Sequence, residues 1–232
     1  MDELVFPFNE WDSNFLKEAD LDHSWLTERV FSRLQVPPPP PMESGEEAFR
    51  VEDLHYRLLD ELIVCKAGGQ LCDRVKEIQR QDSGFMKDFL DLAKSLGSSH
   101  FGELNNLFDA IDPFAPKAYF FFKRHFARAR PYHYLPKLVP PKGAPVIERP
   151  KHPAYPSGHA TMSFLYAHLC AECMPLGKEA FFRLATRISL NRELAGVHFS
   201  SDSQAGILLG RQLFEIMLVT PAARSFIDAA RE

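Results

Sequence analysis

The sequence predicts an all-α protein in which a single helical domain carries most of the chain. Apolar residues recur at the three- and four-residue spacing of amphipathic helices, for example at Leu58, Leu59, Leu62 and Ile63. No stretch shows the alternation that a half-buried strand requires, and no internal repeat is visible. With 232 residues, 45% of them hydrophobic, the chain is long enough to bury a sizeable core.

Glycine and proline divide the helical pattern into segments. We expect helices within residues 46–96, broken at Gly68-Gly69 and again over 96–100, and then one long helical region over 103–130 that ends at Pro131. A proline-rich loop should follow over 131–156. Helices are expected again over 159–174, 178–194, 201–218 and 221–231.

The first part of the chain differs from the rest. Residues 1–35 contain short amphipathic stretches and are predicted to be an N-terminal helical extension, and residues 36–232 the main domain. The main domain opens with Val36 and five prolines, so residues 36–41 must be extended polyproline II. This segment is either a strap across the domain or a ligand for a proline-reading protein.

Charge and hydropathy restrict the partners. A net charge of −4 argues against a nucleic-acid-binding protein, whereas the basic stretch around 117–151 favours a small anionic ligand. No window has the roughly 18 apolar residues of a spanning helix, so no integral membrane segment is expected. The acidic start of the chain lacks the features of a secretory signal. The protein is therefore cytoplasmic as written, or periplasmic or secreted if a leader was removed.

The chain has four cysteines, Cys65, Cys72, Cys170 and Cys173. The last two have the C-x-x-C spacing of a redox or metal motif, but they lie in an apolar helical run without a second pair. We interpret them as structural residues of a buried helix.

Three clusters combine phosphate-binding groups with suitable local geometry. The first is Lys123 and Arg130, followed by Pro131. Seven steps along a helix return almost to the starting direction, so both cations are expected on one helical face. Arg124 and Arg128 are interpreted as a solvated face of the same helix, although Arg128 could also lie at the entrance of a site. A fixed pair of cations suits a tetrahedral oxyanion.

The second cluster is Ser157, Gly158 and His159, which precede an apolar helical run. Backbone N–H groups at a helix N-terminus favour an anion, and glycine allows close approach. His159 would lie beside the anion, where it could donate a proton. An ordinary helix cap with an incidental histidine would give the same local sequence.

The third cluster is Arg192, His198 and Asp202. His198 and Asp202 are four residues apart, so a helix that begins near His198 would place the carboxylate beside the imidazole. Such a carboxylate fixes the tautomer and leaves the other ring nitrogen free to attack. Gly196 provides a break that would let Arg192 turn towards the same centre.

Together, Lys123-x6-Arg130-Pro131, Pro156-Ser157-Gly158-His159 and Arg192-x5-His198-x3-Asp202 resemble the signature of the type 2 phosphatidic acid phosphatase superfamily. That superfamily includes bacterial class A nonspecific acid phosphatases and vanadium-dependent haloperoxidases. The first motif, with Arg128 before Arg130, and the polyproline strap are most similar to the class A enzymes. The resemblance covers about residues 34–232. One departure is Asn191, which stands where the pattern usually has serine.

The resemblance implies a single-domain helical bundle that hydrolyses phosphate monoesters through a phosphohistidine, without a metal or other cofactor and with broad specificity. It implies phosphate binding by Lys123, Arg130, Ser157, Gly158 and Arg192. It also implies catalysis by His198 as nucleophile, His159 as proton donor and Asp202 as the group that orients His198. The expected partner is a small phosphorylated substrate, and homo-oligomers are common among such relatives.

Two alternatives remain open at this level. In a vanadium-dependent haloperoxidase the same phosphate-binding residues, called the cradle below, would hold vanadate as cofactor. Residues 151–159 look somewhat like the haloperoxidase version of the middle motif. The short chain and the first motif favour the phosphatase. A soluble lipid or prenyl (di)phosphate phosphatase is the second alternative, because the cradle specifies phosphate and leaves the leaving group undetermined.

Overall fold

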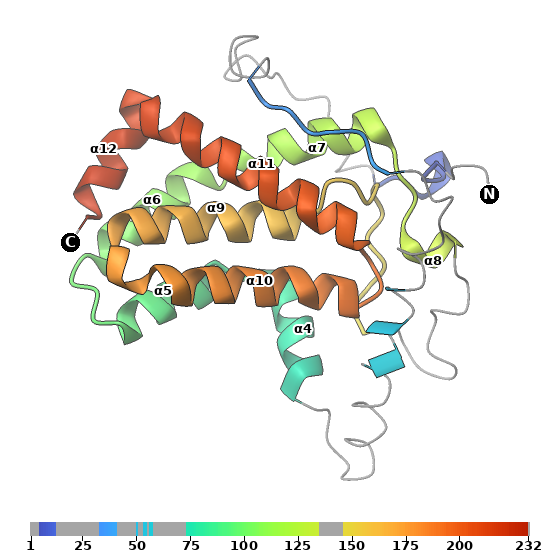
Figure 1. Ribbon diagram of the computed structural model, residues 1–232, viewed down its shortest axis with the longest axis horizontal. Helices are drawn as coiled ribbons and strands as arrows, with labels where there is room; N and C mark the ends of the chain where they lie inside the picture. The colour runs from blue at the N-terminus through green and yellow to red at the C-terminus, as the bar shows by residue number, and fades with distance from the viewer. Residues whose placement is uncertain are drawn as a thin grey trace.

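The computed structural model describes residues 5–12, 33–40, 50, 53–54, 56–57, 73–134 and 146–231 (Figure 1). Within these ranges the regular elements are helices, and the β-type pairing is one isolated bridge between Val5 and Arg128. The predicted all-α class is confirmed.

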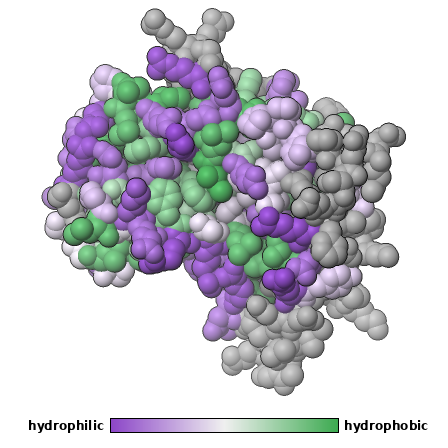
Figure 2. All heavy atoms as spheres, in the orientation of Figure 1, coloured by the Kyte–Doolittle hydropathy of each residue, from purple (hydrophilic) through white to green (hydrophobic). Residues whose placement is uncertain are grey.

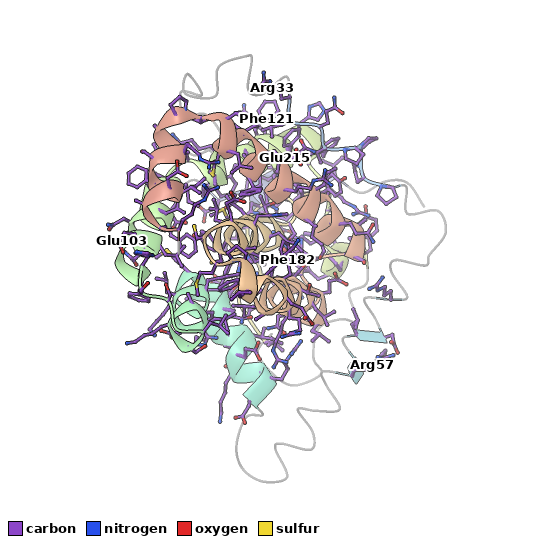
Figure 3. The ribbon with its side chains drawn as sticks, turned by 60° about the vertical axis from the view of Figure 1, so that its left-hand side comes forward. Arg33, Arg57, Glu103, Phe121, Phe182 and Glu215 are labelled. Carbon is purple, nitrogen blue, oxygen red and sulfur yellow. The ribbon has the colours of Figure 1, made fainter. Side chains whose placement is uncertain are left out.

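Three helices form the centre of the bundle, namely α9 (Gly158–Cys173), α10 (Lys178–Leu194) and α11 (Ser200–Val219). Figure 1 shows α9 between the other two, with α10 antiparallel to it and α11 parallel to it. Helix α9 is apolar around its circumference, and such a helix has to be covered on all sides. Figure 3 views α9 and α10 nearly end-on; there Phe182 of α10 contacts Phe164 and His168 of α9.

The remaining helices cover this centre. They are α4 (Asp73–Ser83), α5 (Met86–Ser95), α6 (Phe101–Ile111), α7 (Ala115–Phe126), α8 (Pro131–Tyr134) and α12 (Pro221–Ala229), with short 3₁₀ turns at Phe8–Glu10 and Pro175–Gly177. The core that they share is built from fully buried aromatic and aliphatic side chains, including Phe89, Phe108, Leu165 and Phe181. The predicted helices over 159–174, 178–194, 201–218 and 221–231 agree with the observed ones to within about two residues.

The predicted long helical region over 103–130 is wrong. It is divided by a turn at 112–114, where Pro113 has no N–H to continue the hydrogen-bond ladder, and Pro116 occupies the first turn of α7. Helix α7 ends at Phe126 because Ala127 adopts a left-handed conformation with φ of 47°. Arg128 and Arg130 therefore lie outside the helix that carries Lys123, on a non-helical segment.

Helices α9 and α11 cross in close contact, because glycine occupies the crossing point. A Cβ atom on Gly210 would lie 2.4 Å from the carbonyl oxygen of Thr161, and one on Gly206 would lie 2.5 Å from that of Ser157. Both obstacles are backbone atoms, which cannot move without shifting α9. The two glycines thus set the distance between the helices.

We expect Gly210→Ala to lower the free energy of unfolding by about 1–3 kcal/mol, because the new methyl group overpacks a rigid contact. Denaturant unfolding followed by circular dichroism measures this change. Gly102→Ala is the matched control: a Cβ there has nothing within 4 Å, and alanine in a helix should be neutral or slightly stabilising. Equal stability of the Gly210 variant and the wild type would contradict the close crossing.

The strap predicted at 36–41 is described up to residue 40 and has neither helical nor strand structure. It is tied to the body at two places. Tyr155 donates its hydroxyl proton to the carbonyl of Pro37 at 2.6 Å, and Gln35 and Gln212 exchange two hydrogen bonds of 2.7 and 2.9 Å. Most of the predicted N-terminal extension, and residue 41, lie outside the described residues.

Cys170 and Cys173 are buried free thiols, which agrees with a structural role, and Cys65 and Cys72 lie outside the described residues. Among the described helices none could cross a membrane on its own by length and hydropathy, although α11 and α12 pass that test as a pair bent by 93°. On the face shown in Figure 2, apolar and hydrophilic side chains are interspersed.

Candidate active site

A cavity of about 880 Å³ is lined by residues from the start of α9, from the end of α10 and from the segment before α11. Figure 1 shows that these three helix ends lie at the same end of the bundle. The cavity is lined by six of the eight residues predicted from the sequence: Lys123, Arg130, Gly158, His159, Arg192 and His198. The other two, Ser157 and Asp202, are fully buried beside it and do not line it. Three sequence clusters up to about 80 residues apart therefore meet at one place.

Lys123 comes from the last turn of α7 and is fully buried. Its ammonium group donates to the carbonyls of Pro153 at 2.8 Å and Ala154 at 2.9 Å. An ammonium has three protons, so one remains to donate to a ligand. Burial, with the nearby Arg130 charge, holds the pKa of Lys123 well below its ordinary value.

Arg130 is held by the backbone around it. Its guanidinium donates to the carbonyls of His152 at 2.8 Å and Val197 at 2.6 Å, and more weakly to that of Pro153 at 3.3 Å. It also lies 3.5 Å from Nε2 of His198. Burial lowers the pKa of Arg130 to about 10. Arg130 thus joins its own segment to the loop of His152 and Pro153 and to the loop of Val197. It also carries a fixed positive charge beside His198.

The guanidinium of Arg192 uses only part of its hydrogen-bond donors within the described residues. Nη1 donates to Asp82 of α4 at 2.6 Å, whereas Nε is buried and has no hydrogen-bond partner among the described residues. A buried donor without a partner is costly, and a charged one more so. Arg192 lines the cavity, so an anion there would satisfy it.

The start of α9 follows the predicted cap geometry. Ser157 is the N-cap residue, and its hydroxyl accepts the N–H of Ala160 at 3.4 Å, so this side chain serves the helix. Gly158 does line the cavity. A Cβ there would lie 3.0 Å from the ring of Tyr119, so the glycine also lets that ring approach the helix terminus.

His159 is held by α4. Its Nε2 lies 3.1 Å from the carbonyl oxygen of Gln81, which can only accept, so Nε2 is the protonated nitrogen and Nδ1 is left to exchange a proton. The ring packs against Phe85 with centroids 5.3 Å apart. Burial and the charge of Arg192 hold the pKa of His159 well below its ordinary value.

His198 and Asp202 form the predicted pair. Nδ1 of His198 lies 3.2 Å from Oδ2 of Asp202, and the same oxygen accepts the N–H of Phe199 at 2.8 Å. The helix begins at Ser200, with Phe199 as its N-cap residue, so Asp202 lies in the first turn and His198 precedes the helix. Burial, with Arg130 and Lys123, lowers the pKa of His198 well below its ordinary value, so the ring is neutral with Nε2 unprotonated.

Arg128 differs from its predicted place on a solvated face or at the entrance. It is only 2% exposed and does not line the cavity, because the left-handed turn at Ala127 directs the chain away from the exposed side of α7. Its guanidinium donates to Oδ1 of Asp202 at 2.7 Å and to the hydroxyl of Ser201 at 2.6 Å.

Several functional neighbours were not found from the sequence. Asp82 and Gln81 come from α4, which has no motif, and they support Arg192 and His159. His152 accepts from Arg130 through Nδ1 at 3.1 Å. Asn191, which departs from the usual serine, donates to Gln81 at 2.6 Å and thereby ties α10 to α4. Of these residues, only His152 could have been identified from the sequence, because it lies in the basic, proline-rich stretch.

The site as a whole carries an excess of positive charge close to His198. Three buried cations, Lys123, Arg130 and Arg192, face the cavity, and the buried carboxylate of the pair, Asp202, is already bonded. In the described ranges, no three His, Cys, Asp or Glu side chains converge as metal ligands would. The arrangement can bind a compact oxyanion and place an unprotonated imidazole nitrogen beside it.

Comparison with known proteins identifies the fold and the family. The chain has the fold of a solved structure described as the first bacterial vanadium-dependent iodoperoxidase, with a TM-score of 0.61 and 16% identity over 86% of this chain. That alignment covers 53% of the other chain, so this protein spans about half its length. No curated protein matches the sequence significantly. A family model, PAP2 superfamily, matches residues 112–225, which include all three clusters. Residues 112–225, and with them the helices and loops that carry the site, belong to the PAP2 superfamily.

Proposed function

We propose that this protein is a phosphatase that hydrolyses phosphate monoesters through a phosphohistidine at His198, without a metal ion. The observation that carries the proposal concerns Arg192, whose buried Nε has no hydrogen-bond partner among the described residues. Arg192 lines the same cavity as His198, whose pKa is held well below its ordinary value by burial and by Arg130. Unsatisfied cationic donors beside a nucleophile are what phosphoryl transfer requires, because its catalysis is mainly positioning and charge neutralisation.

In the proposed reaction, the non-bridging oxygens of the phosphoryl group bind Arg192, the free proton of Lys123, Arg130 and the N–H of Gly158. Nε2 of His198 donates its lone pair to phosphorus while the bond to the leaving oxygen breaks. Nδ1 of His159 gives that oxygen a proton. A water molecule then attacks the phosphohistidine, His159 takes its proton, and inorganic phosphate leaves.

The low pKa of His159 is compatible with a role as acid. The cations that depress it, Arg192 foremost after burial, are the ones that a phosphate dianion would bind. Their charge is then offset, and the pKa of His159 should rise in the complex. The acid is therefore expected to form only when substrate is present.

Hydrolysis of p-nitrophenyl phosphate in the presence of EDTA tests the function. We expect turnover that EDTA leaves unchanged and that inorganic phosphate and vanadate inhibit competitively. Loss of turnover in EDTA would contradict the metal-free mechanism.

The cradle would also fit vanadate, so a second assay is needed. With added vanadate, hydrogen peroxide and iodide or bromide, the proposal expects no halide oxidation above background. Halide oxidation without phosphatase activity would replace the proposal by the haloperoxidase alternative.

His159→Gln should slow the hydrolysis of substrates with poor leaving groups, such as alkyl phosphates, about 10²–10⁴-fold, because they need a proton to depart. p-Nitrophenolate leaves without one, so the same variant should lose much less activity on p-nitrophenyl phosphate. Steady-state kinetics on both substrates measures the difference. Equal losses on both would contradict the assignment of His159 as the acid.

A further inference from the structure

Arg128 is a buried arginine that the proposed mechanism leaves without a role. Its side chain is 1% exposed and does not line the cavity, so it is not expected to touch substrate. Its backbone is fixed on two sides: it pairs with Val5, and its carbonyl accepts the N–H of Ala154 at 2.9 Å. A buried cation held in this way needs an explanation, because its desolvation is costly.

Within the described residues, the guanidinium of Arg128 contacts Asp202 and the groups around it. It donates to Oδ1 of Asp202 and to the hydroxyl of Ser201, and it lies 4.5 Å from the ring centroid of Phe199 and 5.8 Å from that of Tyr155. The rings exclude water and favour the cation. In such surroundings the attraction between two charges is much stronger than in water.

Asp202 consequently shares its charge among three donors. Oδ1 serves Arg128 at 2.7 Å, and Oδ2 serves the N–H of Phe199 at 2.8 Å and Nδ1 of His198 at 3.2 Å. The contact with His198 is the longest of the three. A buried carboxylate without a counter-charge favours the protonated form of a neighbouring imidazole, and an imidazolium has no lone pair with which to attack.

We propose that Arg128 is a positioning residue: by offsetting the charge of Asp202, it lets this carboxylate orient His198 without drawing a proton onto the nitrogen that faces the cavity. The proposal rests on the phosphatase function proposed above for its consequence in catalysis. Its effect on the protonation of His198 can be measured without any activity.

The other groups that face His198 come from every neighbouring element. They are Lys123 of α7, Arg130 of the segment after it, His152 of the loop, His159 of α9, Arg192 of α10 and Asp202 of α11. Asp202 is the anion among them. Removing Arg128 takes away the cation that is hydrogen-bonded to this anion, so the pKa of His198 should rise.

The test compares Arg128→Met with Arg128→Lys, two side chains of similar length of which one is charged. Two-dimensional NMR of the histidine rings, with the His198 signal identified by its loss in His198→Gln, follows protonation with pH. We expect the titration midpoint of His198 in Arg128→Met to rise by about one pH unit or more. Arg128→Lys should stay near the wild type, and Arg124→Met, at an exposed site on α7, should equal it.

Activity supplies the second readout. The acid limb of the pH profile of kcat on p-nitrophenyl phosphate should shift upward with the NMR midpoint, while KM changes less than threefold. If Arg128 only stabilised the fold, its replacement would lower the folded fraction and leave the acid limb of the pH profile where it is. An unchanged midpoint in Arg128→Met, or an equal shift in Arg128→Lys, would overturn the proposal.

Ser201→Asp keeps the test decisive if Arg128→Met does not fold. The new carboxylate lies in the first turn of α11, where acidic residues are tolerated, and competes with Asp202 for the guanidinium. The midpoint of His198 should again rise, and an unchanged midpoint would overturn the proposal. A wild-type protein without phosphatase activity would instead contradict the proposed function, and the NMR titration would still decide the influence of Arg128.

Discussion

His198→Ala should abolish turnover, with kcat on p-nitrophenyl phosphate lowered by a factor of about 10⁴ or more. In the proposed mechanism the side chain forms the bond to phosphorus, and the contact of its Nδ1 with Asp202 leaves Nε2 unprotonated for that attack. The loss should be in kcat, because the cations that bind the phosphoryl group remain.

Rapid quenching with ³²P-labelled substrate provides the direct measurement. The wild type should yield an acid-labile, base-stable phosphoprotein, and His198→Ala should yield none. His125→Ala is the matched control, because this histidine is exposed on α7 two residues after Lys123. Substantial turnover or labelling in His198→Ala would rule out the phosphohistidine at this position.

Arg192→Gln should give the second large effect, an inhibition constant for inorganic phosphate about 100-fold higher and kcat/KM lowered at least as much. Among the phosphate-binding cations, Arg192 has a buried donor without a partner in the described part of the chain, so its interaction energy is available to the ligand. The fold should survive, because the side chain of its partner Asp82 is 29% exposed and can be hydrated.

Competitive inhibition by phosphate and isothermal titration calorimetry both measure this change. Arg183→Gln provides the control, since this arginine lies on the same helix and pairs with Glu179 at the surface. Phosphate affinity equal to that of the wild type in Arg192→Gln would show that the oxyanion binds elsewhere. Thermal unfolding should be compared, so that reduced folding is not mistaken for weaker binding.

The helices of the centre could be predicted because their signals are local. Helices α9, α10 and α11 are apolar runs of helical length, and the cap at Ser157 defines the start of α9. The argument for the first cluster failed for the opposite reason. Lys123 and Arg130 do line one cavity, but the chain leaves the helix at Ala127. Alanine is not typical of a left-handed helix end, so nothing in the sequence indicates that the helix stops there.

The supporting residues could not be predicted because their contacts are long-range. Asp82 and Arg192 are 110 positions apart, and nothing in the sequence around Asp82 distinguishes it from any other exposed-helix carboxylate. The pairing of Arg128 with Asp202 spans 74 positions and depends on the turn at Ala127. Periodicity can identify the face of one helix, whereas the meeting of two loops depends on the packed fold.

The glycine crossing of α9 and α11 has a consequence for how this protein tolerates change. The backbone N–H of Ser157 donates to the carbonyl of Asp202 at 2.9 Å. The contact that sets the distance between these helices therefore also joins the start of α9, which carries His159, to the first turn of α11, which follows His198. A substitution that widens the crossing must separate these histidines as well. Thermal tolerance and turnover should therefore decline together in random variants of this region, and selecting for one would select for the other.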